Sequence, residues 1–194
     1  YSAVFSLNMT PVEGFDISAA YTRTASKELT GMPGSDASSA FTYIPTVGGP
    51  NYAPLHNSQY VTPDRIFVNL SYRDKGGNSF GVFYESMRGG GTNYSYMYEN
   101  DMNGDNYNYD SIYIPTDAQI ENNEFRFVSE DDKARYMAYA AKDPYLSKNK
   151  GKYAEAYSLY TPWSHRVDLQ YFHDFKLKIG QSTNTLRLSV DVKN

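Results

Sequence analysis

Oxygen-bearing side chains alternate in the segment DMNGDNYNYDSIYIP, residues 101–115. Asp101, Asn103 and Asp105 are each separated by one residue, a spacing typical of the start of a calcium-binding loop. Asp110 follows as a candidate closing ligand. Ca²⁺ favours carboxylate and carbonyl oxygens, so these four residues are the predicted metal ligands, and Ca²⁺ is the one cofactor that the sequence suggests.

A complete EF-type calcium loop is excluded. Such a loop needs glycine at its sixth position and an acid at its twelfth, and here Asn106 and Ile112 occupy those places. Two interpretations stay open for the segment. It is a partial calcium site that backbone carbonyls or another loop complete, or it is a solvated polar turn.

Candidate catalytic groups are few. Ser164, His165 and Asp168 invite comparison with a hydrolase triad, but residues three apart on a strand point to opposite faces. The paired carboxylates at 130–132 lie in a solvated run that suits the first turn of a helix. The sequence contains no nucleophile elbow, zinc-protease or phosphate-loop motif, and we expect no catalytic residues and no enzyme.

Tyrosine is the commonest aromatic residue, with 20 copies in 194 residues. Its ring offers a stacking surface and its hydroxyl a hydrogen bond, which suits sugar or peptide ligands. The alternative is that tyrosines fill long strands. The predicted substrate-binding residues are Tyr43, Tyr52, Tyr96, Tyr98, Tyr107 and Tyr109.

Composition excludes several classes of protein. The formal net charge of −4 and the sequence pI near 5.4 argue against nucleic acid as a partner. The absence of cysteine excludes a disulfide scaffold and a cysteine-based zinc site. The aromatic content of 16% indicates a folded chain. The sequence has no run of 18 apolar residues of the kind that forms a transmembrane helix.

Alternation of apolar and polar residues with period two predicts an all-β, antiparallel protein. Six strands in three hairpins are expected, each hairpin closed by a turn of about five residues. The expected strands lie near residues 2–10, 15–25, 64–73, 79–100, 164–179 and 185–194.

The connections between the hairpins are long, at residues 26–63 and 101–163. Ser129 begins a capping-box pattern that predicts one short helix in the second connection. Short turns at one end and long loops at the other are typical of an up-and-down outer-membrane β-barrel, here as a segment with two extracellular loops. A soluble β-sandwich with one buried face is the alternative, since alternation alone does not separate the two.

Polar residues on the opposite face of these strands would then line the lumen of the barrel. We expect them to meet water or one another, with ion pairs between the last two strands. The predicted lumen-lining residues are Arg73, Arg166, Asp168, Gln170, Arg187 and Asp191.

The region 143–175 resembles the late barrel of TonB-dependent outer-membrane transporters of the Oar-like branch. The resemblance rests on YLSK at 145–148, GKYAE at 151–155 and PWSHRVDL at 162–169. The terminal TLRLSVDVKN and the segment NGDNYNYDSIYIP are also similar to that family. The similarity covers about residues 65–194, and residues 1–64 follow by pattern only.

The resemblance implies a C-terminal part of the barrel, in the cell outer membrane, that contributes wall and external binding loops to energised uptake of an oligosaccharide, peptide or metal chelate. Its implied partners are outer-membrane lipid, the inner-membrane TonB complex and a surface lipoprotein. The TonB complex would act through an N-terminal part, which includes the plug domain and is not in this chain. The abrupt ends of the chain suggest a piece of a longer protein. The rival hypothesis is a surface-exposed or secreted β-sheet binding module, adhesin-like, whose Tyr-rich loops hold the ligand.

Overall fold

The computed structural model describes residues 1–31, 34–96 and 101–194. The chain divides into two compact units, each assembled from separate segments. The sheet unit comprises Tyr1–Ala25, Val61–Gly89 and Thr161–Asn194. The loop unit comprises Ser26–Tyr60 and Gly90–Tyr160.

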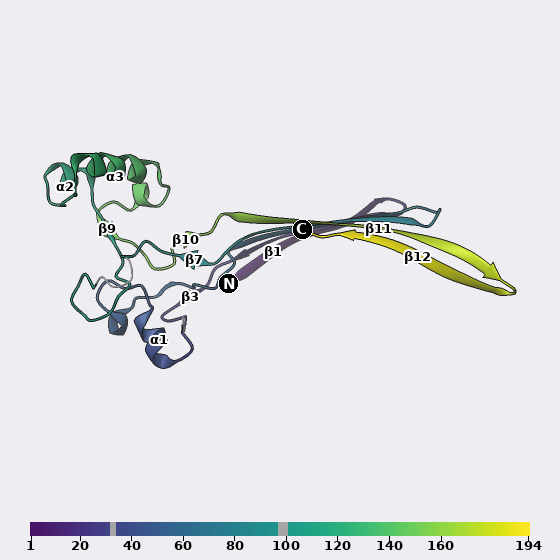
Figure 1. The fold of residues 1–194 in the computed structure, drawn as a ribbon, viewed down its shortest axis with the longest axis horizontal. Helices are drawn as coiled ribbons and strands as arrows, with labels where there is room; N and C mark the ends of the chain where they lie inside the picture. Colours follow the sequence, from purple (N-terminus) through teal and green to yellow (C-terminus); the bar gives the residue numbers. More distant parts are fainter. Residues whose placement is uncertain (32–33, 97–100) are drawn as a thin grey trace. The chain divides into compact units, whose positions relative to one another are not determined.

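The sheet unit is one antiparallel sheet of six strands in the order β1-β2-β5-β6-β11-β12, so that each long strand pairs with its nearest long neighbour in the chain (Figure 1). Among the described residues, β1 and β12 each pair with a single strand and form the two edges of the sheet. The strands are β1 (Ser2–Val12), β2 (Phe15–Thr24), β5 (Asp64–Arg73), β6 (Asn78–Arg88), β11 (Trp163–Ile179) and β12 (Ser182–Val192).

Three tight turns close the hairpins at one end of the sheet. Each contains a glycine with positive φ, namely Gly14 at 81°, Gly77 at 91° and Gly180 at 63°. Glycine adopts this left-handed backbone without a steric penalty, which is why the turns fall there. The pairs Arg23↔Asp64 and Trp163↔Arg88 lie at the other end, and both long connections leave the sheet from it. The expected three hairpins are confirmed.

Apolar residues form continuous rows across one face of the sheet. The register places one apolar residue of each strand in the same row, which runs Met9, Ile17, Leu70, Val82, Leu169 and Val192. Many large apolar side chains on this face are exposed, including Leu7 at 54% and Leu188 at 57%. All eleven residues of β1 and all eleven of β12 are exposed. The sheet unit by itself therefore leaves much of its apolar face uncovered.

The expected strand over residues 79–100 is too long. β6 ends at Arg88, and residues 97–100 of that prediction lie outside the described part of the chain. The glycines after β6 start a different structure, in which Gly91 N–H donates to the carbonyl of Gln59 at 2.9 Å. A Cβ on Gly90 would lie 2.3 Å from that carbonyl oxygen, so only glycine permits this approach.

The loop unit contains short elements only. Its strands pair as β3 with β4, β7 with β10 and β8 with β9. They are β3 (Lys27–Glu28), β4 (His56–Asn57), β7 (Gly91–Thr92), β8 (Tyr113–Ile114), β9 (Lys152–Tyr153) and β10 (Leu159–Tyr160). Its helices are α1 (Ala37–Thr42), η1 (Pro50–Tyr52), α2 (Asp117–Glu121), α3 (Glu130–Lys142) and η2 (Leu146–Lys148).

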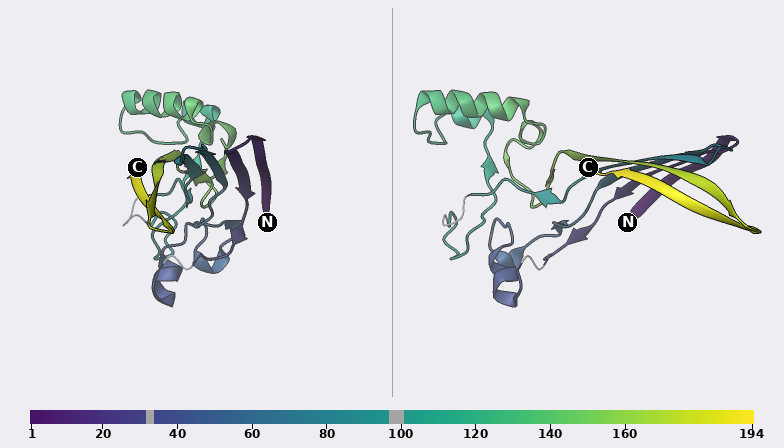
Figure 2. Two further views of the ribbon diagram at one scale, coloured as in Figure 1. Left: turned by 90° about the vertical axis from the view of Figure 1, so that its right-hand side faces the viewer. Right: turned by 45° about the vertical axis from the view of Figure 1, so that its right-hand side comes forward.

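The loop unit has its own core of Ile114, Ala140, Leu146 and Ala154, which are at most 3% exposed. Helix α3 starts at the predicted cap, since the Ser129 hydroxyl accepts from Asp132 N–H at 3.1 Å. The expectation of one helix in the second connection was wrong, because both α2 and α3 lie there, and α1 lies in the first connection (Figure 2). None of the described helices is long and apolar enough to cross a membrane.

Candidate functional site

Three extended backbone segments of the loop unit lie together and form a thin layer, which we call the central layer. Thr46 pairs with Asp110 in a parallel bridge, and Ser95 pairs with Ser111 in an antiparallel one. Ser111 N–H donates to the carbonyl of Thr46 at 2.8 Å, and Tyr96 N–H donates to that of Asp110 at 2.9 Å. Successive side chains of extended backbone point to opposite sides, so this layer supplies residues to two different pockets.

The first pocket, called the tyrosine pocket, has a volume of about 450 Å³. None of the described residues that line it carries a charged side chain, which suits a neutral ligand held by stacking and hydrogen bonds. Its lining consists of Tyr43, Pro45, Gln59, Gly91, Thr92, Asn93, Ser95, Tyr109 and Tyr157.

Two features of the tyrosine pocket cost conformational or solvation energy. Tyr109 and Tyr157 have φ of 82° and 52°, a left-handed backbone that is rare for bulky residues. The side-chain oxygen of Gln59 is buried without a hydrogen-bond donor among the described residues. Burial raises the pKa of the Tyr157 hydroxyl to about 12, so this hydroxyl stays protonated at neutral pH. Strained backbone and an unpaired acceptor in one pocket are features that cluster at binding sites.

The second pocket, called the acidic pocket, has a volume of about 460 Å³. It differs from the first by two carboxylates, Asp110 and Glu124. The remaining lining residues are Val47, Tyr96, Met102, Asn103, Ser111, Tyr113, Gln119, Phe125 and Tyr153.

Three aromatic rings of the acidic pocket contact one another. Tyr113 and Phe125 stack with their centroids 5.6 Å apart and an interplanar angle of 3°. Tyr153 meets Tyr113 edge to face at 5.2 Å, which follows from the pairing of β8 with β9. These contacts order the aromatic side of the pocket before any ligand arrives.

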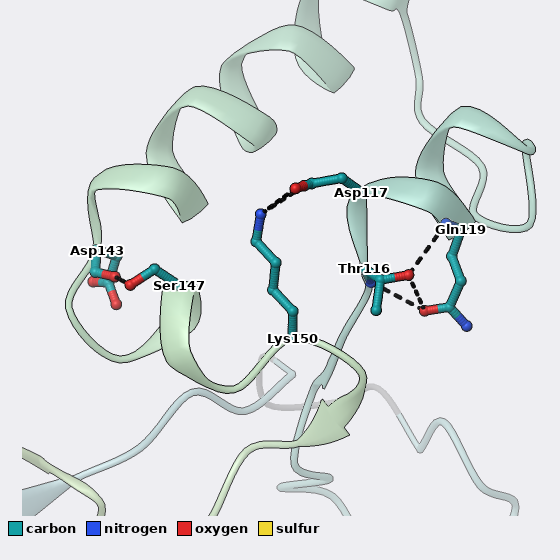
Figure 3. Close-up of polar contacts among 6 residues, drawn as sticks. All are labelled: Thr116, Asp117, Gln119, Asp143, Ser147 and Lys150. Carbon is teal, nitrogen blue, oxygen red and sulfur yellow. Dashed lines mark hydrogen bonds and ion pairs between the residues drawn. The ribbon is translucent and has the colours of Figure 1, made fainter.

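Helix α2 anchors the polar side of the acidic pocket through a capping box (Figure 3). The Thr116 hydroxyl accepts from Gln119 N–H at 3.2 Å, and Gln119 Oε1 accepts from Thr116 N–H at 3.0 Å. Gln119 Oε1 also accepts from the hydroxyl of Tyr113 at 3.3 Å. Lys150 holds the same turn by an ion pair with Asp117 at 2.6 Å.

The predicted metal ligands lie together next to this pocket. Asp101 accepts hydrogen bonds from the backbone N–H groups of Gly104, Asp105 and Asn106. The Asn103 amide donates to Asp105 at 3.0 Å and to Asp110 at 3.2 Å. The hydrogen bond from Asn106 N–H has the largest effect among these, and it holds the pKa of the Asp101 carboxyl below its usual range.

These contacts bear on calcium in two ways. A carboxylate has about four lone-pair positions, and Asp101 uses three of them for the backbone. The Val47 carbonyl, from the other connection, accepts from the Asn103 amide at 3.0 Å and adds a further oxygen. Across the described residues, no group of three or more His, Cys, Asp or Glu is arranged to hold a metal ion. Calcium binding stays a prediction.

The predicted substrate-binding tyrosines separate into several places. Tyr43 and Tyr109 line the tyrosine pocket, with their rings edge to face at 5.7 Å, and Tyr96 lines the acidic pocket. Tyr107 packs against Phe41, and Tyr52 is 81% exposed and lines neither pocket. Tyr98 lies outside the described residues.

The predicted lumen-lining residues share the polar face of the sheet, in register across neighbouring strands. Arg166 pairs with Asp168 along the same strand, and Gln170 donates to Asp191 at 2.8 Å. Arg187 pairs with Asp174 across β11 and β12, because the register sets Asp174 and Arg187 directly opposite each other.

Phe172 lies between two cations of this face. The Arg187 guanidinium lies 4.1 Å and that of Arg73 5.4 Å from the centre of its ring. Arg73 is the last of the predicted lumen-lining residues. Among the described residues, its guanidinium has the Phe172 ring as a cation–π partner and forms no ion pair with a carboxylate.

Several pocket residues were not predicted from the sequence. Gln119 could have been found from its Thr116-x-x-Gln119 capping pattern before a helical turn. Gln59 and Tyr157 lie in segments without a local signal, and contacts far along the chain bring them to the tyrosine pocket. Glu124, Phe125 and Tyr153 join the acidic pocket in the same way.

Comparisons of the chain with protein-family models, with curated proteins and with solved structures found no match.

Proposed function

We propose that this chain is part of an outer-membrane TonB-dependent receptor, in which the sheet unit forms barrel wall and the loop unit forms external ligand-binding loops. The receptor takes up a nutrient ligand, an oligosaccharide, a peptide or a metal chelate, by energised transport. The observation that carries the proposal is the exposed apolar face of the six-stranded sheet, whose rows cross every strand.

The dimensions of the strands support this assignment. A strand of 11 residues, such as β1 or β12, extends about 36 Å. At a tilt of about 45°, it spans about 25 Å, the height of the apolar band of an outer-membrane barrel. The opposite face carries arginine, aspartate and glutamine in hydrogen-bonded pairs, as a water-filled lumen requires.

The binding role is supported by the loop unit. Its two pockets have volumes typical of small-molecule sites, and aromatic rings with a few polar groups line both. The strained backbone at Tyr109 and Tyr157 and the unpaired oxygen of Gln59 support the tyrosine pocket as one of the binding sites of the loop unit.

Fractionation of cells that express the natural full-length protein tests the membrane assignment. We expect the protein in the outer-membrane fraction, released only by detergent. Recovery from the water-soluble fraction without detergent would overturn the proposal.

The same experiment addresses the second candidate, a surface-exposed or secreted binding module. The separate core of the loop unit favours this candidate, because it orders the pockets without lipid. The module would be recovered from the medium or the cell surface and would stay monodisperse in plain buffer.

A further inference from the structure

The acidic pocket has an unbalanced charge. Asp110 and Glu124 line it, and none of its described lining residues is Lys, Arg or His. In the tyrosine pocket, by contrast, none of the lining residues within the described ranges carries a charged side chain. The described lining of the acidic pocket therefore holds two carboxyl groups and no basic side chain.

Asp110 is buried without a counter-ion among the residues that the structure describes. The residue is only 4% exposed. Its two carboxyl oxygens accept hydrogen bonds from neutral donors, one from Met102 N–H at 2.6 Å and one from the Asn103 amide at 3.2 Å. A buried carboxylate without a cation is costly, which is a reason to look for one in a ligand.

Glu124 supplies a second carboxylate in a different setting. It is exposed, and its side chain has no hydrogen bond or ion pair within the described part of the chain. The backbone holds it in place, since Glu124 N–H donates to the carbonyl of Gln119 at 2.9 Å. This carboxylate is available to a ligand without loss of an internal contact.

The aromatic rings complete the chemistry. Tyr113, Phe125 and Tyr153 form a contacting group, and the negative face of an aromatic ring attracts a cation within about 6 Å. A planar guanidinium can stack on a ring and pair with a carboxylate at the same time, and an ammonium can do so as a point charge.

We propose that the acidic pocket binds the cationic end of an organic ligand, a guanidinium or primary amine such as the side chain of arginine or lysine in a peptide. The inference deepens the binding role of the loop unit given above and selects a basic peptide among the nutrient classes. It does not depend on the membrane assignment, because binding is measured on purified protein.

Isothermal titration of the purified protein with two probes tests the proposal. Nα-acetyl-arginine amide carries the guanidinium, and Nα-acetyl-citrulline amide has nearly the same shape without the charge. We expect the arginine probe to bind at least about tenfold more tightly. Equal affinity of the two probes, or no binding of the arginine probe, would overturn the proposal.

A pair of variants separates a specific contact from general attraction. Glu124→Gln should weaken binding of the arginine probe about fivefold, as expected for one partly exposed ion pair. Glu121→Gln removes the same charge from α2 outside the pocket and should leave the affinity unchanged. Equal effects of the two variants would contradict the proposal. Binding of Ca²⁺ alone, with neither organic probe bound, would also overturn it and indicate a metal site.

Failure here is distinguishable from failure of the proposed function. If the protein fractionates with the outer membrane but does not bind the arginine probe, only the proposed ligand class is wrong. If the protein binds the probe but is recovered without detergent, only the membrane assignment is wrong.

Discussion

The hydroxyl of Tyr94 donates a hydrogen bond of 2.8 Å to Oδ2 of Asp143, the C-cap residue of α3. The other oxygen of Asp143 accepts from the N–H groups of Tyr145 and Leu146 at the start of η2. One carboxylate thus joins the end of α3, the start of η2 and the segment after β7.

Tyr94→Phe should loosen this junction. The substitution keeps the ring and removes the donor, so Asp143 Oδ2 loses a hydrogen bond to a charged group, at a cost of about 1–2 kcal/mol in local opening. Hydrogen exchange of the amides of residues 145 and 146 measures the change.

Tyr139→Phe is the matched control for Tyr94→Phe. The single proton of the Tyr94 hydroxyl goes to Asp143, so Tyr139 is the donor in their 2.9 Å contact. Its loss leaves the bond to Asp143 in place and should change exchange less. A larger effect of Tyr139→Phe would contradict the arrangement.

Acid should open the same junction. Burial opposes ionisation of Asp143, but hydrogen bonds from Leu146 N–H and the Tyr94 hydroxyl outweigh it and lower the pKa of this carboxyl. Because the pKa of this carboxyl is lower in the folded than in the unfolded protein, its ionised form stabilises the fold. This stabilisation is complete above the unfolded pKa of about 3.9 and is lost as the pH falls through the folded pKa. Cleavage by pepsin next to η2 should therefore increase as the pH is lowered below about 4. Because pepsin itself is more active in acid, the comparison is with Asp143→Asn, which should show a weaker pH dependence than the native protein. An equal dependence in the two proteins would refute the assignment.

Neighbouring residues on β12 should differ in their surroundings. Leu188 is on the apolar face and Ser189 on the polar face, and the protein has no native cysteine to remove. Spin labels on Leu188→Cys should collide more with oxygen in the membrane-embedded protein, and labels on Ser189→Cys more with a water-soluble nickel chelate.

Gly48→Cys is the control for spin labelling. A Cβ at Gly48 meets no atom within 4 Å, so a label there is free to contact the nickel chelate. Equal accessibility of the labels at 188 and 189 would contradict a sheet with one face in lipid.

Gln59→Met should stabilise the loop unit. The substitution removes a buried oxygen that has no donor, and an unsatisfied acceptor costs about 1–3 kcal/mol. Gln119→Met is the control and should destabilise the unit, because that oxygen accepts from Thr116 and Tyr113. Local opening free energies from hydrogen exchange compare the two variants. Destabilisation by Gln59→Met would mean that its oxygen has a partner in solution.

Calcium should protect the segment 101–110 from protease. The oxygens of Asp101, Asn103 and Asp105 lie in one short loop, and Ca²⁺ would offset their mutual repulsion. Protection by Ca²⁺ and its loss on chelation are the expected results. Asp105→Asn should reduce the protection, and no effect of Ca²⁺ on the native protein would leave a polar turn as the correct interpretation.

Local residue patterns were enough to predict the strands, the turns and the main helix. Alternation located the six strands because side chains on a strand alternate between the two faces, whatever lies around them. Gly14 and Gly77 marked turns because only glycine tolerates those φ values easily, and Ser129 marked the start of α3 because its hydroxyl caps the helix locally. These signals act over a few residues and are visible in the chain.

The pockets and the ion pairs depend on contacts between distant segments. Thr46 and Asp110 are 64 positions apart by their numbers, and their pairing creates the layer that divides the two pockets. The register of β11 and β12 selected Asp174 as the partner of Arg187, although Asp191 is closer along the chain. The strand predicted over residues 79–100 ends early, at Arg88, where the following Gly90 closely approaches Gln59, 31 positions earlier. Such contacts depend on how distant segments pack, and no local pattern of residue types encodes them.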